Sequence, residues 1–228
     1  MPKVVIICTS AIKLGDKSTG VWIEELAAPY YEFKDRGFEV VLGSMAGGPV
    51  PIDAGSMGEG FFTDAAKKFM HDGDAVGALC HTPALADIDF ASADGVFVPG
   101  GHGCCTDMAD SPALKGAIET VFAAGKAVAA VCHGPMALPQ CNKPDGTPLV
   151  AGHAVAGFSN TEESAVGLTD AVPFLLEDKL KEKGGLYERG DDWNSKVCVA
   201  NGGLLVTGQN PQSSEATAKA FADAVAAL

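Results

Sequence analysis

The stretch AVAAVCHGPMAL, residues 127–138, decides the fold that this sequence predicts. Residues 127–131 are small or β-branched and apolar, which is typical of a strand that is buried on both faces. Cys132 follows directly, and Gly134 and Pro135 then bend the chain into a segment that can begin a helix. A nucleophile on a sharp strand-to-helix turn normally reads G-x-S-x-G, and here the pattern reads A-V-C-H-G. The partial positive charge of a helix N-terminus would stabilise a Cys132 thiolate, whereas the alternative is a buried structural cysteine.

Apolar strands and helical segments alternate along the rest of the chain. Strands are predicted at residues 3–9, 38–44, 95–98 and 127–131, and helices at residues 22–36, 64–71, 111–125, 172–183 and 213–228. Two further strands, residues 196–200 and 204–207, form a C-terminal hairpin around Asn201-Gly202-Gly203. Apolar strands separated by helices indicate an α/β fold, with a doubly wound, mainly parallel sheet and helices on both faces. Residues 1–228 contain no linker or internal repeat and are expected to form one domain.

Composition narrows the possible partners and compartment. The 228 residues carry a net charge of -13, which disfavours nucleic acid and anionic membranes as partners. We find no apolar run that is long enough to span a bilayer, and the N-terminal segment is interpreted as a strand, not a signal peptide. The seven cysteines lack a disulfide-framework spacing, which favours a reducing, cytoplasmic location. The absence of CxxC and HExxH motifs predicts no metal site.

A second glycine-rich turn follows the strand at residues 95–98. It reads Pro99-Gly100-Gly101-His102-Gly103. Parallel sheets collect ligands at the carboxyl ends of their strands, so this turn is expected beside Cys132. The backbone N–H of Gly101, together with that of His133, would then form an oxyanion hole. Gly100 and His102 are candidate pocket residues. The simpler interpretation is that the two glycines only turn the chain.

Four segments give the sequence a resemblance to a known family: STGVWIEELAAPYYEFKDRGFEVVLGS, DGVFVPGGHG, AVAAVCHGP and LVTGQNPQSS. Over nearly the whole chain it resembles the ThiJ/PfpI superfamily, the class I glutamine amidotransferase-like proteins with a flavodoxin-like fold. Within that superfamily it is most similar to the branch of glyoxalase III enzymes and stress chaperones. The resemblance implies that Glu25, which follows Thr19-Gly20-Val21, lies against the nucleophile Cys132. A solvated Glu24-Glu25 pair is the alternative.

The same resemblance implies a Cys-His-Glu triad. His133, directly after the cysteine, would be the base. The acid of the branch follows a Gly-Phe pair, and its spacing selects Glu163 over Glu162. Both glutamates could instead be exposed first-turn residues of a helix capped by Thr161. Cys104 and Cys105 follow the glycine-rich turn, and no role is assigned to them.

The activity implied by the resemblance is that of a glutathione-independent glyoxalase, which converts a small 2-oxoaldehyde, methylglyoxal, to lactate without a cofactor. A homodimer is also expected from it. Two other classes stay open. The same residues suit a cysteine hydrolase, that is, a peptidase, amidase or protein deglycase. A holdase chaperone with a redox-sensitive cysteine would need a large exposed apolar patch.

Overall fold

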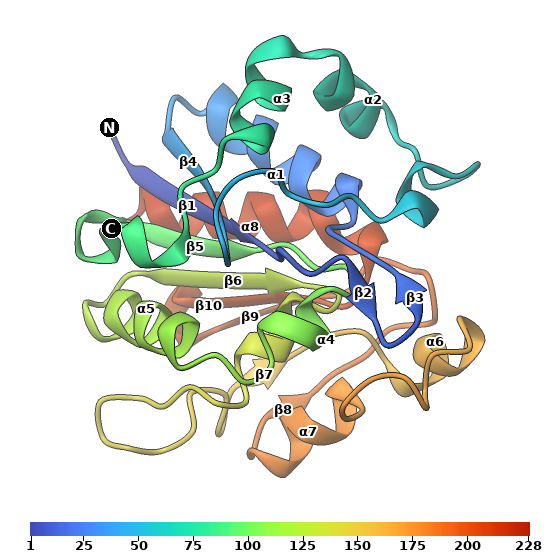
Figure 1. The fold of residues 1–228 in the computed structure, drawn as a ribbon. Helices are drawn as coiled ribbons and strands as arrows, with labels where there is room; N and C mark the ends of the chain where they lie inside the picture. The colour runs from blue at the N-terminus through green and yellow to red at the C-terminus, as the bar shows by residue number, and fades with distance from the viewer.

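A computed structural model describes all 228 residues and contains a six-stranded sheet in the order β4-β1-β5-β6-β10-β9 (Figure 1). Its strands are β1 (Lys3–Cys8), β4 (Glu39–Ser44), β5 (Gly95–Val98), β6 (Ala127–Val131), β9 (Val197–Ala200) and β10 (Leu205–Gly208). All neighbours pair in parallel except β9 and β10, which are antiparallel. Two smaller sheets pair β2 (Lys13–Leu14) with β3 (Lys17–Ser18) and β7 (Ala154–Val155) with β8 (Leu186–Tyr187).

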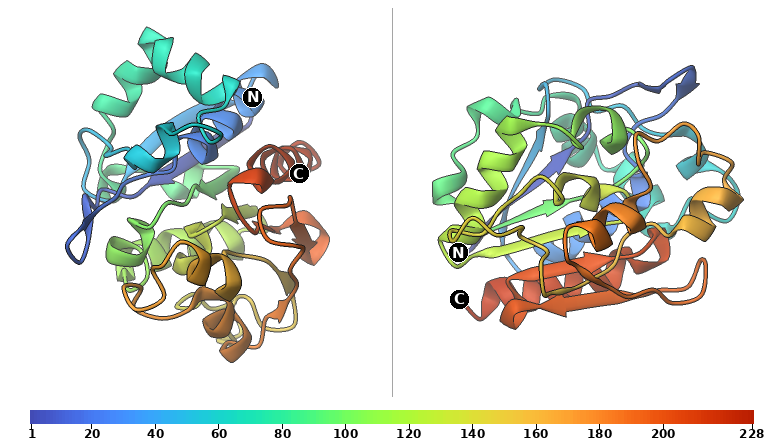
Figure 2. Two further views of the ribbon diagram at one scale, coloured as in Figure 1. Left: turned by 90° about the vertical axis from the view of Figure 1, so that its right-hand side faces the viewer. Right: turned by 90° about the horizontal axis from the view of Figure 1, so that it is seen from below.

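Helices cover both faces of the sheet, as Figures 1 and 2 show. On one face α1 (Ile23–Asp35) and α8 (Ser214–Ala226) pack against each other, and α2 (Asp64–His71) packs outside α1. The other face is covered by α5 (Pro112–Ala123), which contacts β5 and β6. The remaining helices are α3 (Gly73–Cys80), α4 (Cys104–Asp107), α6 (Asn160–Ala165) and α7 (Leu176–Glu182).

An aromatic cluster joins the sheet to the first of these helical layers. The Phe97 ring of β5 lies 5.7 Å from that of Phe33 in α1 and 5.8 Å from that of Phe221 in α8, centroid to centroid. Gly95 makes this approach possible, because a Cβ there would lie 2.6 Å from the Phe221 ring. These contacts hold α1 in place, and with it the first helical turn that carries Glu25.

The predicted doubly wound, mainly parallel sheet with helices on both faces is confirmed. The C-terminal hairpin is present, but it forms the edge of the main sheet, because β10 also pairs with β6. The helix predicted at residues 172–183 begins only at Leu176, since Pro173 disfavours a helical conformation at Val172. Helix α3 was not predicted.

The carboxyl ends of the parallel strands meet at one edge of the sheet, on the right in Figure 1. The β2–β3 hairpin and α6 lie around this edge. None of the helices combines the length and the apolar character needed to cross a membrane.

Candidate active site

Cys132 lies immediately after β6 with a φ of 59°, in the left-handed region that non-glycine residues rarely adopt. Two backbone hydrogen bonds hold it there: its N–H donates to the Gly208 carbonyl at 3.0 Å, and its carbonyl accepts from the Phe158 N–H at 2.9 Å. Gly134 is required because a Cβ there would lie 2.2 Å from the Val98 carbonyl oxygen. The expected sharp turn after a central strand is therefore present, with the strain concentrated at the cysteine.

The segment after Cys132 is a 3₁₀ turn, Gly134–Ala137, and not the expected longer helix. Pro139 explains this, because it disfavours helical continuation through Leu138. The expected thiolate stabilisation by a helix N-terminus is accordingly wrong. Burial, together with the negative charge of Glu25, raises the pKa of the Cys132 thiol.

Glu25 reaches the Cys132 sulfur from the first turn of α1 and is fully buried. Its Oε2 accepts the Gly100 N–H at 2.7 Å, its Oε1 has no hydrogen-bond partner in the protein, and Cys132 is its neighbour. Burial raises the pKa of this carboxyl to about 8. The Glu25 carboxyl and the Cys132 thiol therefore both hold their protons at neutral pH, and an ionised sulfur is compatible only with a protonated Glu25.

The glycine-rich turn after β5 brings backbone groups to the same sulfur. Gly100 does not line the cavity but gives its N–H to Glu25, and a Cβ there would lie 2.6 Å from the Glu25 Oε2. The Gly101 N–H lies near the Cys132 sulfur and opposes the rise in its pKa. The His133 N–H has no acceptor in the protein. Two N–H groups are thus available beside Cys132.

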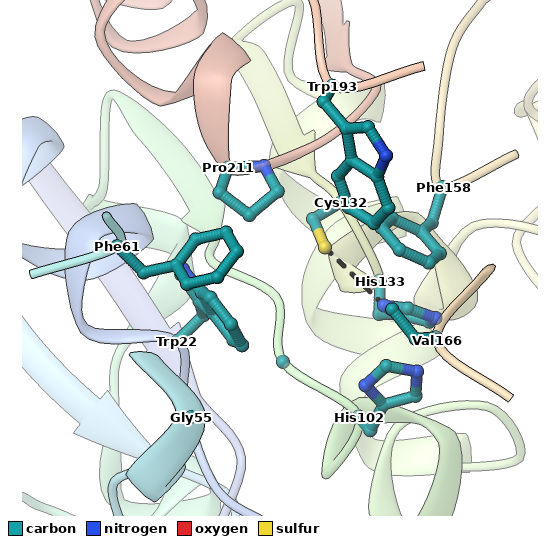
Figure 3. Close-up of a pocket in the computed structure, with 11 residues that line it drawn as sticks. Trp22, Gly55, Phe61, His102, Cys132, His133, Phe158, Val166, Trp193 and Pro211 are labelled. Carbon is teal, nitrogen blue, oxygen red and sulfur yellow. Dashed lines mark hydrogen bonds between the residues drawn. The ribbon is translucent and has the colours of Figure 1, made fainter. Parts of the chain in front are cut away.

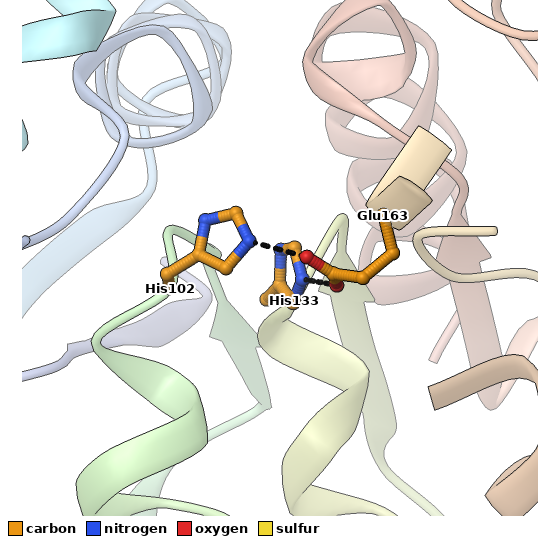
Figure 4. A group of neighbouring side chains, drawn as sticks. All are labelled: His102, His133 and Glu163. Carbon is orange, nitrogen blue, oxygen red and sulfur yellow. Dashed lines mark hydrogen bonds and ion pairs between the residues drawn. The ribbon is translucent and has the colours of Figure 1, made fainter. Parts of the chain in front are cut away.

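The His133 ring links the Cys132 sulfur to Glu163. The His133 Nδ1 is 3.4 Å from the Cys132 Sγ (Figure 3), and its Nε2 is 2.7 Å from the Glu163 Oε2 (Figure 4). Burial lowers the His133 pKa to about 4, so the ring is neutral at pH 7. Burial alone would raise the Glu163 pKa, but hydrogen bonds from His102 and His133 outweigh it and lower that pKa to about 2.

Glu162 and Glu163 are both buried in the first turn of α6, and the cap of this helix is Ser159, not Thr161. Glu162 closes a capping box with Ser159, and its Oε1 accepts the Trp193 N–H at 2.9 Å. The same oxygen accepts hydrogen bonds from Gln209 and Asn210. Glu162 therefore ties three segments together, whereas Glu163 faces the histidines.

His102 contacts the same carboxylate as His133, which the sequence did not indicate. Its Nε2 lies 2.9 Å from the Glu163 Oε1, and its ring centroid lies 3.9 Å from that of His133. The two histidines and Glu163 form a compact group whose atoms also suit a metal ion. Those atoms are already paired with one another, so a metal would have to replace these hydrogen bonds. The sequence-based expectation of no metal site stays a prediction.

A cavity of about 180 Å³ opens above the sulfur (Figure 3). Aromatic and aliphatic side chains that were not singled out from the sequence form most of its wall: Trp22, Phe61, Phe158, Val166, Trp193 and Pro211. Cys132, His133 and His102 are its reactive lining residues. Cys104 and Cys105 do not line it, and burial raises the pKa of both thiols.

Comparisons with known proteins identify the family and relatives that match the whole chain. The DJ-1/PfpI family model matches residues 19–164. The chain is 30% identical to Glyoxalase 3 of Candida albicans, covering 100% of this chain and 99% of the relative. It is 31% identical to a glutathione-independent glyoxalase of Schizosaccharomyces pombe, covering 92% and 90%. The crystal structure of glyoxalase III from Candida albicans superposes with a TM-score of 0.89 at 29% identity, covering 98% and 97%. The crystal structure of Rapid Encystment Protein 24 kDa from Francisella tularensis superposes with a TM-score of 0.93 at 32% identity, covering 99% of each chain.

Proposed function

Since this chain belongs to the DJ-1/PfpI family, we propose that it is a glutathione-independent glyoxalase that converts methylglyoxal to lactate. The observation that carries the proposal is the position of the Cys132 sulfur. It lies between a buried Glu25 carboxyl and the His133 ring, at the floor of a small and mostly apolar cavity. Relatives of similar length that bear the glyoxalase name support it.

The first step is addition of the sulfur to the aldehyde carbon, C1. The Cys132 thiol gives its proton to the His133 Nδ1, the sulfur forms the S–C1 bond, and the Glu25 carboxyl gives its own proton to the aldehyde oxygen, which yields a hemithioacetal. The N–H groups of Gly101 and His133 stabilise the negative charge that develops on this oxygen. The neutral His133 ring can act as this base because Glu163 orients it and leaves the Nδ1 lone pair facing the sulfur.

The second step moves a hydrogen from C1 to C2. Glu25, now a carboxylate, removes the C1 proton to give an enediolate, the C2 oxygen takes the proton of the C1 hydroxyl, and Glu25 returns its proton to C2. The product is a lactoyl thioester of Cys132, with no net oxidation. Water then cleaves the S–C1 bond, which releases lactate and returns protons to Cys132 and Glu25.

The size of the cavity favours a small aldehyde over a peptide. About 180 Å³ lies above the sulfur, and Trp22, Phe61 and Trp193 stand around it. A peptidase requires an open groove on both sides of its nucleophile. The exposed large apolar side chains, such as Ile12 and Val199, come from separate elements of the chain. The hydrolase and chaperone classes are therefore outcomes of the test and not further proposals.

Two finer points belong to the same proposal. We expect the protein to act in the cytoplasm, where its seven free thiols stay reduced. We also expect a homodimer, in which exposed apolar groups such as Ile12, 66% exposed, become covered. Light scattering of the purified full chain measures the oligomeric state directly, and a monomeric mass at micromolar concentration would contradict the dimer.

The experiment is to follow methylglyoxal loss and lactate appearance without glutathione. The wild type is compared with Cys132→Ser and with Cys198→Ser, whose cysteine lies in β9 outside the cavity. We expect lactate from the wild type and from Cys198→Ser, and none from Cys132→Ser. If the wild type forms no lactate but releases amines from glycated or amide substrates, the hydrolase class replaces the glyoxalase.

A further inference from the structure

We propose that His102 is a catalytic base that activates the water which releases lactate from Cys132, and that it works as a dyad with Glu163. This inference rests on the proposed function, because it concerns the last step of that reaction. The two histidines that share Glu163 then have different roles. His133 acts on the Cys132 sulfur, and His102 acts on the water.

The tautomers of the two rings follow from their common partner. Glu163 is a carboxylate with a pKa of about 2, so both of its oxygens accept hydrogen bonds and donate none. The Nε2 atoms of His102 and His133, 2.9 Å and 2.7 Å from those oxygens, must therefore carry the protons. Each ring, when neutral, is left with a lone pair on Nδ1.

The two Nδ1 atoms face different surroundings. That of His133 lies 3.4 Å from the Cys132 sulfur, and the His133 side chain is completely buried. That of His102 has no hydrogen-bond partner in the protein, and the His102 side chain is 13% exposed. Figure 3 shows this nitrogen turned toward the open space between the His102 ring and Trp22. A basic nitrogen with an anchored ring is thus available inside the cavity but unused at the sulfur.

Water has a route to this nitrogen. His102 lines a second chamber of about 300 Å³, whose wall includes Lys17, Ser18, Thr19 and Asp53. This partly polar chamber shares Trp22, His102 and Val166 with the apolar cavity above Cys132. His102 therefore stands where a chamber with polar groups that can bind water meets the apolar cavity that suits the substrate.

The step balances with water as the only co-reactant. The water oxygen forms a bond to C1 of the lactoyl thioester, and one water proton passes to the His102 Nδ1. The His102 Nε2–H stays hydrogen-bonded to Glu163 throughout this step. The S–C1 bond then breaks, the sulfur leaves as thiolate, and the proton on His102 returns to the Cys132–Glu25 pair or to solvent. A histidine held by a carboxylate activates water in the same manner in acyl-enzyme hydrolysis generally.

The test separates acylation from hydrolysis in His102→Gln. We expect an initial burst of about one acyl group per site at a near wild-type rate, followed by turnover lowered about a hundredfold to ten-thousandfold. Rapid-quench measurement of methylglyoxal consumption gives the burst. Hydroxylamine forms an oxime with methylglyoxal, so it is added after the free aldehyde has been removed; it then attacks the accumulated thioester without a base and should rescue each site as lactohydroxamate, whereas a hemithioacetal would only release methylglyoxal.

Three controls make each outcome decisive. His71→Gln alters an exposed histidine of α2 and should behave as wild type. His102→Asn repeats the substitution with a shorter amide, and its unfolding midpoint checks the fold. Turnover of both His102 variants within about threefold of wild type would overturn the inference, and so would loss of the burst without rescue by hydroxylamine. Absence of lactate from the wild type would overturn the proposed function itself.

Discussion

The Glu25 carboxyl lies beside the Cys132 sulfur inside the protein, where Glu25 is fully buried and Cys132 is only 3% exposed. No basic side chain neutralises this pair: the polar groups around it are the N–H groups of Gly100 and Gly101 and the neutral His133 ring. Burial therefore keeps both acidic groups protonated at neutral pH. Both the chemistry and the stability of the protein should depend on the Glu25 proton.

Glu25→Gln should lower glyoxalase turnover about a hundredfold to ten-thousandfold, because an amide donates a hydrogen bond to sulfur but transfers no proton. The matched control is Glu24→Gln, since Glu24 precedes it in α1 and contacts Thr63 outside the cavity above Cys132. Lactate formation under saturating methylglyoxal measures the effect. Near-normal turnover of Glu25→Gln would remove Glu25 from the proton transfer.

The same substitution should change how stability depends on pH. Burial raises the Glu25 pKa from 4.5 to about 8, so the folded state binds the proton more tightly than the unfolded state. Its contribution to stability is full below pH 4.5 and is lost as the pH rises to about 8. Glu25→Gln lacks this loss. Its free energy of unfolding relative to wild type should therefore increase between pH 5 and pH 8, by at most about 1.4 kcal/mol for each pH unit. Urea unfolding at several pH values tests this, and a constant difference would contradict it.

Substitution of Glu162 should mainly lower stability, whereas substitution of Glu163 should mainly lower activity. Glu162→Gln disturbs a capping box and three further hydrogen bonds, so we expect a loss of about 1–3 kcal/mol in unfolding free energy. Glu163→Gln should lower turnover much more than stability, because its partners are the rings at the sulfur. Denaturant midpoints and kcat measured on the same samples distinguish the two. An exchange of the two outcomes would show that Glu162 is the triad acid.

The strained backbone at Cys132 predicts a stability difference between two inactive variants. At a φ of 59° an alanine is strained and a glycine is not, so Cys132→Gly should be about 1 kcal/mol more stable than Cys132→Ala. Both variants remove the sulfur, so the comparison isolates the backbone. Equal unfolding midpoints would show that the turn carries no strain.

The sequence predicted the sheet and the position of the nucleophile well. The apolar runs at residues 95–98 and 127–131 end at Pro99 and Cys132, and the strands β5 and β6 have those same bounds. Local residue types determine such strands, because both of their faces are buried. The short 3₁₀ turn after Cys132 was missed because Pro139 lies beyond the elbow pattern that suggested a helix.

The cavity wall could not be predicted in the same way. Trp22, Phe61, Phe158 and Trp193 come from four distant segments, and an aromatic residue in a loop has no pattern that distinguishes it from core. The task of Glu162 was equally hidden, since its partners Trp193, Gln209 and Asn210 are far along the chain. Tertiary contacts between loops decide these features, and periodicity carries no information about them.

The reactive residues lie at the carboxyl ends of the strands, whereas loops form much of the cavity wall. This difference has a consequence for how such proteins evolve. A Cβ at Gly100 or Gly134 would lie 2.6 Å or 2.2 Å from its nearest neighbour, so nearly every exchange at the two glycines is excluded. Phe61 and Trp193 lie on partly exposed loops with far more freedom to vary. Descendants of a common ancestor can therefore diverge in the compounds they accept while inheriting the same reactive sulfur, through mutations that selection on folding tolerates.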